Sequence, residues 1–391
     1  MIFNPALKAR ALRAGHPGPP KKIMEVYIQF ERKPLHFSRP VDIITCDSPA
    51  TFASSFSRIE SALDNGYYAA GFFSYEAGYC FEEKLNEEKS YGFPLFSMGI
   101  YGRPAYRKMG QPPSPSGEDL KNLRLNITRN RYFSDIETIR DYIRKGDVYQ
   151  ITYCIKLLFE YGGDPARLYL SLLKDQPVPY PAYIDSGRFK MLSLSPEKFI
   201  KKRDSHIVTK PMKGTWPRGR GPVTDTLERI RFQYDAKNRA ENVMIADLLR
   251  NDLGRVGSRI RAPILFEVAG YNTLFQMTST VTGRVDTRIP LRDLFASLFP
   301  SGSVTGAPKI RAMQIIRSLE REERRIYTGA IGYITPERDM FFNIPIRTIL
   351  LDGKRAEMGI GGGIVWDSTP EGEWAEGLLK AKFVTKTCQI G

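Results

Sequence analysis

The sequence predicts an α+β fold, and three observations support this. Short runs with the composition of strands alternate along the chain with stretches whose apolar residues recur at helical spacing. Hydrophobic residues make up 42% of the 391 residues, which is ample for a sizeable core. The sequence contains no run of about 18 apolar residues, the length that spans a bilayer. We therefore expect a globular protein with no membrane partner.

Residues 1–22 are basic, contain several prolines and lack the apolar stretch of a secretory signal. We expect them to form a flexible arm, with a transit peptide as the second interpretation. The cysteines lie far apart and form no CxxC pair, at Cys46, Cys80, Cys154 and Cys388. This spacing indicates neither a disulfide framework nor a thiolate metal site, and it is typical of a reducing compartment. We expect a cytoplasmic protein.

Residues 23–120 are predicted to form a mixed α+β segment. The runs EVYIQFER and YYAAGFFSYEAGY have the composition of strands. Between them, FASSFSRIESALDNG has helical spacing and ends at Gly66. The four prolines of residues 103–118 then predict an exposed connection. A boundary near residue 120 follows.

Residues 121–391 continue the alternation of helices and strands. Ser134 and Glu137 have the spacing of a capping box, which predicts that a helix opens there and runs to Gly146. The run DVYQITYCIKLLFEY predicts a long strand after it. DAKNRAENVMIADLLRNDLG and EGEWAEGLLKAKFV predict two further helices, the second of which follows the glycine-rich strand end GIGGGIVWDS.

The runs LSLSPEKFIKK and HIVTKPM are joined by RDS and predict a hairpin with Glu197 and Lys213 on its two arms. Lys213 lies in PMKGT, where Pro211 stiffens the chain and Gly214 lets another group approach. Neighbouring cations or partial loss of hydration lower the pKa of such an amine. It can then act as a nucleophile, or it can serve as a cation that binds an anion. The residues alone leave both interpretations open.

Acidic side chains offer the candidate metal ligands. The three histidines are isolated in the sequence, at His16, His36 and His206. Glu373, Glu376 and Lys380 share one face of the last predicted helix, which is either a solvated charged face or part of a site. Backbone amides of the glycines before this helix can approach a bound carboxylate. Glu241 is either a surface residue or a further oxygen ligand in a shell that suits Mg²⁺.

The loop SGSVTGAPK does not match a phosphate loop. Gly302 and Gly306 enclose three residues rather than four, and Lys309 follows a proline. Nucleotide binding therefore loses support, although the backbone amides and the Thr305 hydroxyl remain available to another ligand.

Lysine and arginine exceed aspartate and glutamate by 15, that is 58 against 43. This excess is compatible with nucleic-acid binding, with an anionic small substrate or with a basic soluble surface. The basic residues are scattered, and no helix-turn-helix, zinc-finger or RNA-binding signature accompanies them. We expect no nucleic-acid partner.

Together these stretches resemble the chorismate-utilising enzymes, a family that includes anthranilate, aminodeoxychorismate, isochorismate and salicylate synthases. The matching segments cover about residues 130–385 in family order: GDVYQITYC, LSPEKFI, KPMKGT, RAENVMIADLLRNDLGRV, FPSGSVTGAPKIRAM, TGAIGYI, IPIRTILL and GIGGGIVWDS with EWAEGLLKAK. The resemblance implies an anthranilate synthase component I-like fold, with large β-sheets packed with peripheral helices. It also implies that residues 121–391 form a chorismate-binding catalytic domain.

Four positions bear on the branch of the family. Lys213 in PMKGT is similar to the nucleophilic lysine of aminodeoxychorismate synthase component I, where anthranilate synthases carry alanine. Gln150 stands where isochorismate-type enzymes place a lysine base, and Gln276 stands where anthranilate synthases have histidine. Asn238 replaces a second glutamate of some relatives, so we do not expect it to be a ligand. The resemblance favours the aminodeoxychorismate branch, with anthranilate synthase as the alternative.

The resemblance implies a role for each candidate residue. Mg²⁺ is held by Glu241 and Glu376, with Glu373 acting through water. Glu197 is the general acid at C4 of chorismate, and Lys213 is the nucleophile at C2. Substrate contacts are implied at Gln150, Thr215, Thr305, Gly306, Tyr333, Arg347, Gly361, Gly362, Gly363 and Lys380.

The partner is expected to be a glutaminase subunit that supplies ammonia from glutamine. The sequence contains no G-x-C-x-G nucleophile elbow, so we do not expect it to hydrolyse glutamine itself. The implied product is 4-amino-4-deoxychorismate, on the route to para-aminobenzoate and folate.

Overall fold

The computed structural model of the chain describes residues 23–110, 120–271 and 274–385. The predicted arm at residues 1–22 lies outside these ranges, as do residues 111–118 of the predicted proline-rich connection. Among the described residues, no helix has the length and apolar character needed to cross a membrane.

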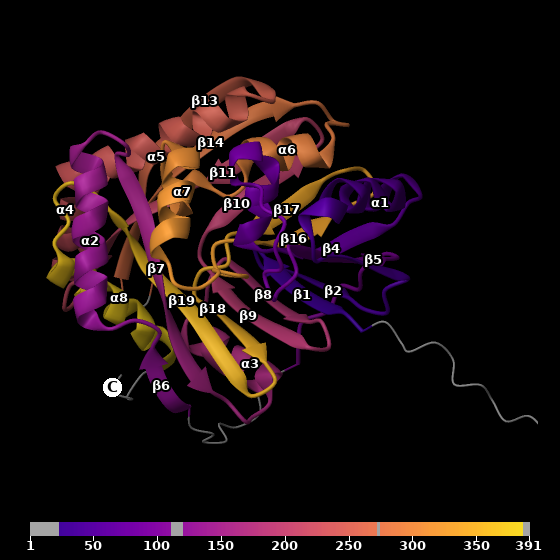
Figure 1. Cartoon of the computed structure of the whole chain (residues 1–391), viewed down its shortest axis with the longest axis horizontal. Helices are drawn as coiled ribbons and strands as arrows, with labels where there is room; N and C mark the ends of the chain where they lie inside the picture. Colours follow the sequence, from indigo (N-terminus) through magenta and orange to yellow (C-terminus); the bar gives the residue numbers. More distant parts are fainter. Residues whose placement is uncertain (1–22, 111–119, 272–273, 386–391) are drawn as a thin grey trace, which may run out of the picture.

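Two large antiparallel sheets form the centre of the protein (Figure 1). The first sheet has nine strands in the order β15-β7-β19-β18-β9-β8-β1-β2, with β6 also paired to β7. Its strands are β1 (Glu25–Phe30), β2 (Lys33–Phe37), β6 (Lys121–Leu125), β7 (Gln150–Glu160), β8 (Tyr180–Asp185), β9 (Phe189–Ser195), β15 (Gly306–Ala307), β18 (Thr348–Asp352) and β19 (Arg355–Ile364).

The second sheet has ten strands in the order β12-β14-β11-β10-β17-β16-β4-β5-β3, with β13 also paired to β14. Its strands are β3 (Asp42–Cys46), β4 (Tyr68–Phe73), β5 (Phe96–Tyr101), β10 (Lys198–Arg203), β11 (His206–Lys210), β12 (Met212–Pro217), β13 (Gly257–Gly270), β14 (Leu274–Val285), β16 (Ala330–Ile334) and β17 (Met340–Asn343). The predicted hairpin is present as β10 and β11, but its predicted arms were wrong: Glu197 lies just before β10, and Lys213 lies beyond β11 on β12, which pairs with β14.

Helices lie around the sheets, which confirms the predicted α+β class with peripheral helices (Figure 1). They are α1 (Phe52–Asp64), α2 (Arg129–Arg144), α3 (Pro165–Asp175), α4 (Pro222–Tyr234), α5 (Ala236–Gly254), α6 (Leu291–Leu298), α7 (Lys309–Leu319) and α8 (Pro370–Thr385). Four short 3₁₀ turns complete the described elements: η1 (Pro49–Thr51), η2 (Tyr75–Phe81), η3 (Glu83–Leu85) and η4 (Gly302–Val304). Helix α8 packs on β19, and helix α5 packs on β12, β13 and β14.

The segment before residue 120 contributes strands to both sheets. In the first sheet β1 pairs with β8, where Ile28 lies opposite Ala182. In the second sheet β4 pairs with β16, where Gly71 lies opposite Gly332. The predicted boundary near residue 120 therefore separates two stretches of sequence that share their sheets.

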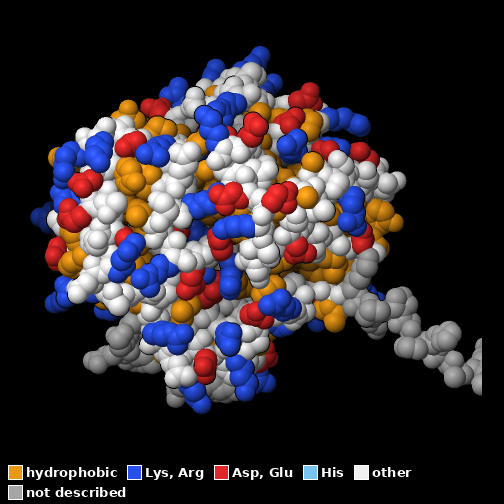
Figure 2. Space-filling model, in the orientation of Figure 1, with side chains coloured by type: hydrophobic (Ala, Val, Ile, Leu, Met, Phe, Trp, Pro, Cys, Tyr) orange, Lys and Arg blue, Asp and Glu red, His pale blue; other side chains and the backbone are white. Residues whose placement is uncertain are grey.

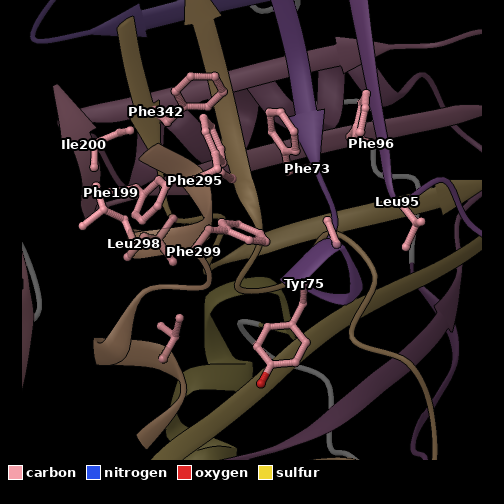
Figure 3. Close-up of a cluster of buried hydrophobic side chains, with 14 of the residues drawn as sticks. Phe73, Tyr75, Leu95, Phe96, Phe199, Ile200, Phe295, Leu298, Phe299 and Phe342 are labelled. Atoms are coloured by element: carbon pink, nitrogen blue, oxygen red, sulfur yellow. The ribbon is translucent and has the colours of Figure 1, made fainter. Parts of the chain in front are cut away.

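Aromatic side chains from both stretches meet in the core (Figure 3). The ring of Phe73 in β4 lies 4.5 Å from that of Phe295 in α6, and Phe342 in β17 lies 5.5 Å from Phe295 edge-on. Phe199 in β10 also packs on Phe295, at 6.1 Å between ring centres. Each such aromatic pair contributes about 0.5–1.5 kcal/mol beyond the area it buries, so this cluster fastens the N-terminal strands to the later ones.

Two local predictions were wrong. Helix α2 begins at Arg129, because the Thr128 side chain accepts the amide proton of Arg131 and caps the helix there. Ser134 and Glu137 therefore lie within the helix rather than in a capping box. The run YYAAGFFSYEAGY is not one strand, since β4 ends at Phe73 and the following residues form η2. Helices α3, α4, α6 and α7 were not predicted individually.

Candidate active site

Lys213 lies on β12, at an irregular point in its pairing with β14. The register shifts between Lys213 and Thr215, and Gly214 between them has φ of +83°. A β-carbon at Gly214 would lie 2.4 Å from Oδ1 of Asn238, so the glycine lets helix α5 sit directly against the strand. The group that approaches this glycine is thus Asn238.

Gln150 and Lys213 meet at the glycine-rich strand β19. A β-carbon at Gly363 would lie 2.4 Å from Nε2 of Gln150 and 2.9 Å from Nζ of Lys213. The side chain of Gln150 is fully buried, and neither its amide nitrogen nor its oxygen has a hydrogen-bond partner. Buried polar atoms normally have partners, so this side chain is available to a bound ligand.

Glu197 lies just before β10 and is 2% exposed. Its Oε1 accepts hydrogen bonds from the hydroxyl of Ser303 at 2.7 Å and from the amide of Met212 at 3.2 Å. Burial raises the pKa of Glu197 to about 7, although these two bonds and the charge of Lys213 act in the opposite direction. The carboxyl therefore exchanges its proton near neutral pH, which suits a general acid.

The amine of Lys213 is shifted towards its neutral form. Loss of hydration lowers its pKa, and the charge of Lys380 acts in the same direction. The carboxylates of Glu241, Glu197 and Glu376 oppose the shift, so all three act on this amine. A lysine with a lowered pKa has the lone pair that a nucleophile needs.

Three further carboxylates come from α5 and α8: Glu241, Glu373 and Glu376. A β-carbon at Gly362 would lie 2.8 Å from Oε2 of Glu373 and 3.8 Å from Oε1 of Glu376, so both point to the opposite face of β19 from Gly363. Burial raises the pKa of Glu373 and of Glu241. Lys380 holds the pKa of Glu376 below its usual value.

Glu376 and Lys380 form an i,i+4 ion pair on helix α8. Nζ of Lys380 lies 2.7 Å from Oε1 of Glu376 and also donates to the carbonyl oxygen of Gly361 at 2.5 Å. The hydroxyl of Ser368 donates to Oε1 of Glu373 at 2.6 Å and leaves Oε2 facing Gly362. Lys380 therefore joins helix α8 to the glycine-rich strand.

The chemistry of these donors fits Mg²⁺, which prefers carboxylate oxygens and keeps several waters. Glu376 raises the pKa of both Glu241 and Glu373, so the three negative charges act on one another. In the described part of the chain, no group of three or more His, Cys, Asp or Glu side chains is placed closely enough to hold a metal ion, so Glu241, Glu373 and Glu376 do not form a ready-made site. Lys380, bonded to Glu376, supplies positive charge beside these carboxylates.

Arg347 is the arginine of the IPIRTILL motif and has φ of +50°. Burial lowers the pKa of its guanidinium, and its centre lies 5.9 Å from the ring of Tyr271. Burial raises the pKa of Tyr271, and the charges of Arg347 and Glu197 also act on this phenol. Tyr271 is a neighbour of the site that the sequence did not indicate, because only the β13–β14 hairpin brings it there.

Tyr333 lies elsewhere than the resemblance implied. On β16 it alternates with Gly332 and Ile334 and projects to the other face of the sheet. Its ring packs 5.8 Å from that of Phe37. The ring of Tyr327 instead covers β19, since a β-carbon at Gly359 would lie 2.2 Å from it. Tyr327 directly precedes the TGAIGYI motif and Tyr333 lies within it, and the motif alone does not tell which of the two faces β19.

The SGSVTG loop is tied to β7 beside Gln150. The amide of Thr152 donates to the carbonyl oxygen of Thr305 at 2.7 Å, and Gly306 pairs with Ile151. The hydroxyl of Thr305 is already bonded to the carbonyl oxygen of Ser301. Thr215 is exposed, and its backbone lies opposite Gln276 on β14.

Charges on the surface are mixed. Figure 2 shows Lys and Arg interspersed with Asp and Glu over the face in view, rather than gathered in one stripe. The ion pairs agree with this, since basic groups on this chain often lie beside acidic ones, as Arg338 does beside Asp64 at 2.9 Å.

The model of the family described as chorismate binding enzyme matches residues 25–386. Among curated proteins, the chain is 41% identical over 270 residues to a protein of Oryza sativa subsp. japonica named probable aminodeoxychorismate synthase, chloroplastic, covering 67% of this chain and 30% of that protein. It is 37% identical over 263 residues to aminodeoxychorismate synthase component 1 of Escherichia coli, covering 67% and 58%. The matches thus span less than two thirds of these relatives.

Two solved structures are similar over most of their length. Anthranilate synthase component I from Streptococcus pneumoniae has a TM-score of 0.74 at 26% identity, covering 97% of this chain and 95% of that one. A putative 2,3-dihydroxybenzoate-specific isochorismate synthase from Bacillus anthracis has a TM-score of 0.78 at 17% identity, covering 94% and 96%. The second likeness concerns the fold alone.

Proposed function

Because the chain belongs to the chorismate-binding enzyme family, we propose that it is an aminodeoxychorismate synthase component I, which converts chorismate and ammonia to 4-amino-4-deoxychorismate. One observation carries this proposal: the amine of Lys213, with its lowered pKa, reaches Gly363 beside the unpartnered amide of Gln150. Glu197, which can hold a proton near neutral pH, acts on the same amine.

Chorismate is a dianion, and Lys380 lies beside the glycine-rich strand while Arg347 lies beside Tyr271. Arg347 and Lys380 would bind its carboxylates, together with backbone amides of Gly361, Gly362 and Gly363. Glu241 and Glu376 would hold Mg²⁺, with Glu373 through a water molecule. When bound, the ion would neutralise the ring carboxylate of the substrate.

The first chemical step joins Lys213 to the ring. The neutral amine attacks C2, the double bonds of the ring shift, and the bond from C4 to its hydroxyl breaks. Glu197 gives its proton to this hydroxyl, which leaves as water; without the proton it is a poor leaving group. The amine loses its own extra proton to water, so a secondary amine at C2 results.

The second step restores Lys213. Ammonia adds at C4, the double bonds shift back, and the bond from C2 to the lysine nitrogen breaks as that nitrogen takes up a proton. Two allylic displacements thereby replace one difficult direct substitution. The product is 4-amino-4-deoxychorismate, which leads to para-aminobenzoate and folate, and we place the reaction in the cytoplasm.

Ammonia is supplied by a partner in this proposal. Relatives such as that of E. coli are named component 1, which implies a second component. The 391 residues contain no G-x-C-x-G nucleophile elbow, so hydrolysis of glutamine is assigned to the second component, a glutaminase.

The test is to identify the product. Purified protein is incubated with chorismate, Mg²⁺ and ammonium, and the products are separated and weighed by mass spectrometry before and after addition of the matching lyase. We expect 4-amino-4-deoxychorismate first and 4-aminobenzoate after the lyase. Anthranilate as the main product would instead support the second candidate function, anthranilate synthase component I. The chain is also 36% identical to anthranilate synthase component 1 of Aquifex aeolicus.

A further inference from the structure

Arg324 forms a buried junction between three segments of the site. It is 3% exposed, and its guanidinium makes five hydrogen bonds, as many as it has N–H groups. Nη1 donates to the carbonyl oxygen of Val304 at 2.8 Å and to the hydroxyl of Thr328 at 3.2 Å. Nη2 donates to the carbonyl oxygen of Thr152 at 2.6 Å and to Glu320 at 2.6 Å, and Nε donates to Glu320 at 2.8 Å.

Two of these acceptors are neighbours of groups in the proposed reaction. Val304 follows Ser303, whose hydroxyl donates to Glu197. Thr152 lies two residues beyond Gln150 on β7 and opposite Gly363 on β19. One cation thus holds both the hydrogen-bond donor of Glu197 and the strand that carries Gln150.

The N-terminal segment fixes Arg324 in turn. The carboxylate of Glu76 in η2 accepts the amide protons of Arg324 at 2.7 Å and of Arg325 at 3.0 Å. The guanidinium centre lies 4.3 Å from the ring centre of Tyr75. Glu320, itself buried, accepts the amide proton of Cys154 at 2.9 Å in addition to its bonds with Arg324. Glu76, Tyr75 and Glu320 therefore all help to hold Arg324 in place.

We propose that Arg324 is a positioning residue for the reaction proposed above, on which this inference rests: it keeps Ser303 bonded to Glu197 and keeps Gln150 beside Lys213. It touches neither substrate nor Lys213, and it acts through Val304 and Thr152. A lysine in its place would retain the charge but has three donors on a single nitrogen and no planar fork, so it cannot replace the five bonds that Arg324 makes from three nitrogens.

The test compares Arg324→Lys with Arg338→Lys. Arg338 is a matched control, because it is also largely buried and ion-paired, to Glu60 at 3.4 Å and Asp64 at 2.9 Å, on a turn of the second sheet. For each variant kcat and KM for chorismate are measured across pH, and thermal unfolding is recorded. We expect kcat of Arg324→Lys to fall about tenfold or more with a smaller change in KM, since small misplacements of reacting groups are costly.

The pH profile separates positioning from a merely structural role. The titratable groups that act on Glu197 are Lys213 on β12 and Tyr271 after β13, and the Ser303 bond lowers the pKa of Glu197. Loss of that bond should move the alkaline limb of the profile to higher pH in Arg324→Lys, and Ser303→Ala should reproduce the move. Arg338→Lys should keep the wild-type limb.

An Arg324→Lys variant that loses thermal stability but keeps the wild-type pH profile and kcat would overturn the inference. If that variant does not fold, Glu76→Gln provides the test, because it weakens the hydrogen bonds to the Arg324 backbone and leaves the guanidinium in place. An alkaline limb of the Glu76→Gln pH profile that stays at the wild-type pH overturns the inference as well. Failure of the proposed function is distinguishable, since it shows in the product of the wild type, whereas these comparisons use whichever chorismate product forms.

Discussion

Gln150 and Lys213 converge on Gly363, where a β-carbon would lie 2.4 Å from Nε2 of the first and 2.9 Å from Nζ of the second. The glycine is therefore the element of the site that allows the amide and the amine to meet over β19. Gly363→Ala should displace one or both polar ends, which belong to flexible side chains, so the fold should survive while turnover falls about tenfold or more.

The matched control for this change is Gly162→Ala, where an added β-carbon meets no atom within 4 Å. Steady-state rates and thermal unfolding of the two variants answer the question. Equal kcat in both variants would show that Gly363 has no special place in the reaction.

Lys213 is expected to form a covalent intermediate. Incubation of the wild type with chorismate and Mg²⁺ but without ammonia should add the mass of chorismate less one water to the intact protein, at a peptide that contains Lys213. Lys213→Ala should lose 4-amino-4-deoxychorismate formation, and any residual product should shift towards the 2-amino isomer or anthranilate. Lys213→Arg keeps the charge but is too basic to attack, so an active Lys213→Arg enzyme without an adduct would rule out the nucleophile.

The pH dependence should be bell-shaped. The proton of Glu197 is lost as pH rises through the pKa of about 7 that burial gives it, which removes the general acid on the alkaline side. Deprotonation of Lys213, whose pKa burial lowers, provides the neutral amine and sets the acid side. Glu197→Gln should reduce kcat about a hundredfold or more and abolish the alkaline limb. If the alkaline limb persists in Glu197→Gln, a group other than Glu197 causes it.

Mg²⁺ binding should depend on Glu241 and Glu376. Isothermal titration with Mg²⁺ alone should show affinity reduced at least about tenfold in Glu241→Ala and in Glu376→Ala, because a small hard-ion site has few protein ligands to lose. Glu371→Ala is the control, since Glu371 is exposed in the first turn of the same helix α8. Wild-type Mg²⁺ affinity in both variants would refute this ligand assignment.

Tyr333 should not contribute to substrate binding, because its ring packs against Phe37 on the other face of β16. Tyr333→Phe should keep KM for chorismate within about twofold of wild type. The comparison variant is Tyr327→Ala, which opens the space over Gly359 and should weaken binding. A rise in KM confined to Tyr333→Phe would restore the role that the sequence resemblance implied.

Local signals in the sequence predicted the parts of the site that lie within one element. The spacing of Glu373, Glu376 and Lys380 placed them on one helix face, and their ion pair and approach to β19 agree with this. Gly214 was expected to admit another group, and Asn238 approaches it. Such features depend on residues a few positions apart, which periodicity and turn chemistry describe well.

Relations between distant segments were not predictable in this way. Gln150, Lys213 and Gly363 meet because β7, β12 and β19 are brought together by two sheets, and nothing near any one of these residues signals the other two. The same holds for Arg324, whose partners lie on β7, on the SGSVTG loop and in η2. Whether Tyr327 or Tyr333 faces β19 depends on which side chains of β16 point to which face of the sheet. The motif does not specify this alternation.

The sharing of both sheets by the N-terminal strands also has a consequence for how the chain folds. Ile28 and Gly71 each have one nearby strand partner, Leu35 and Met98, but their second partners are the distant residues Ala182 and Gly332. Contacts of such long sequence separation slow folding, because the entropic cost of closing the loop comes before the strand pairing stabilises the chain. During synthesis the edge of β4 that pairs with β16 therefore stays unpaired until most of the chain has left the ribosome. The protein should fold as one late cooperative unit, and fragments cut near residue 120 should associate or aggregate rather than fold alone.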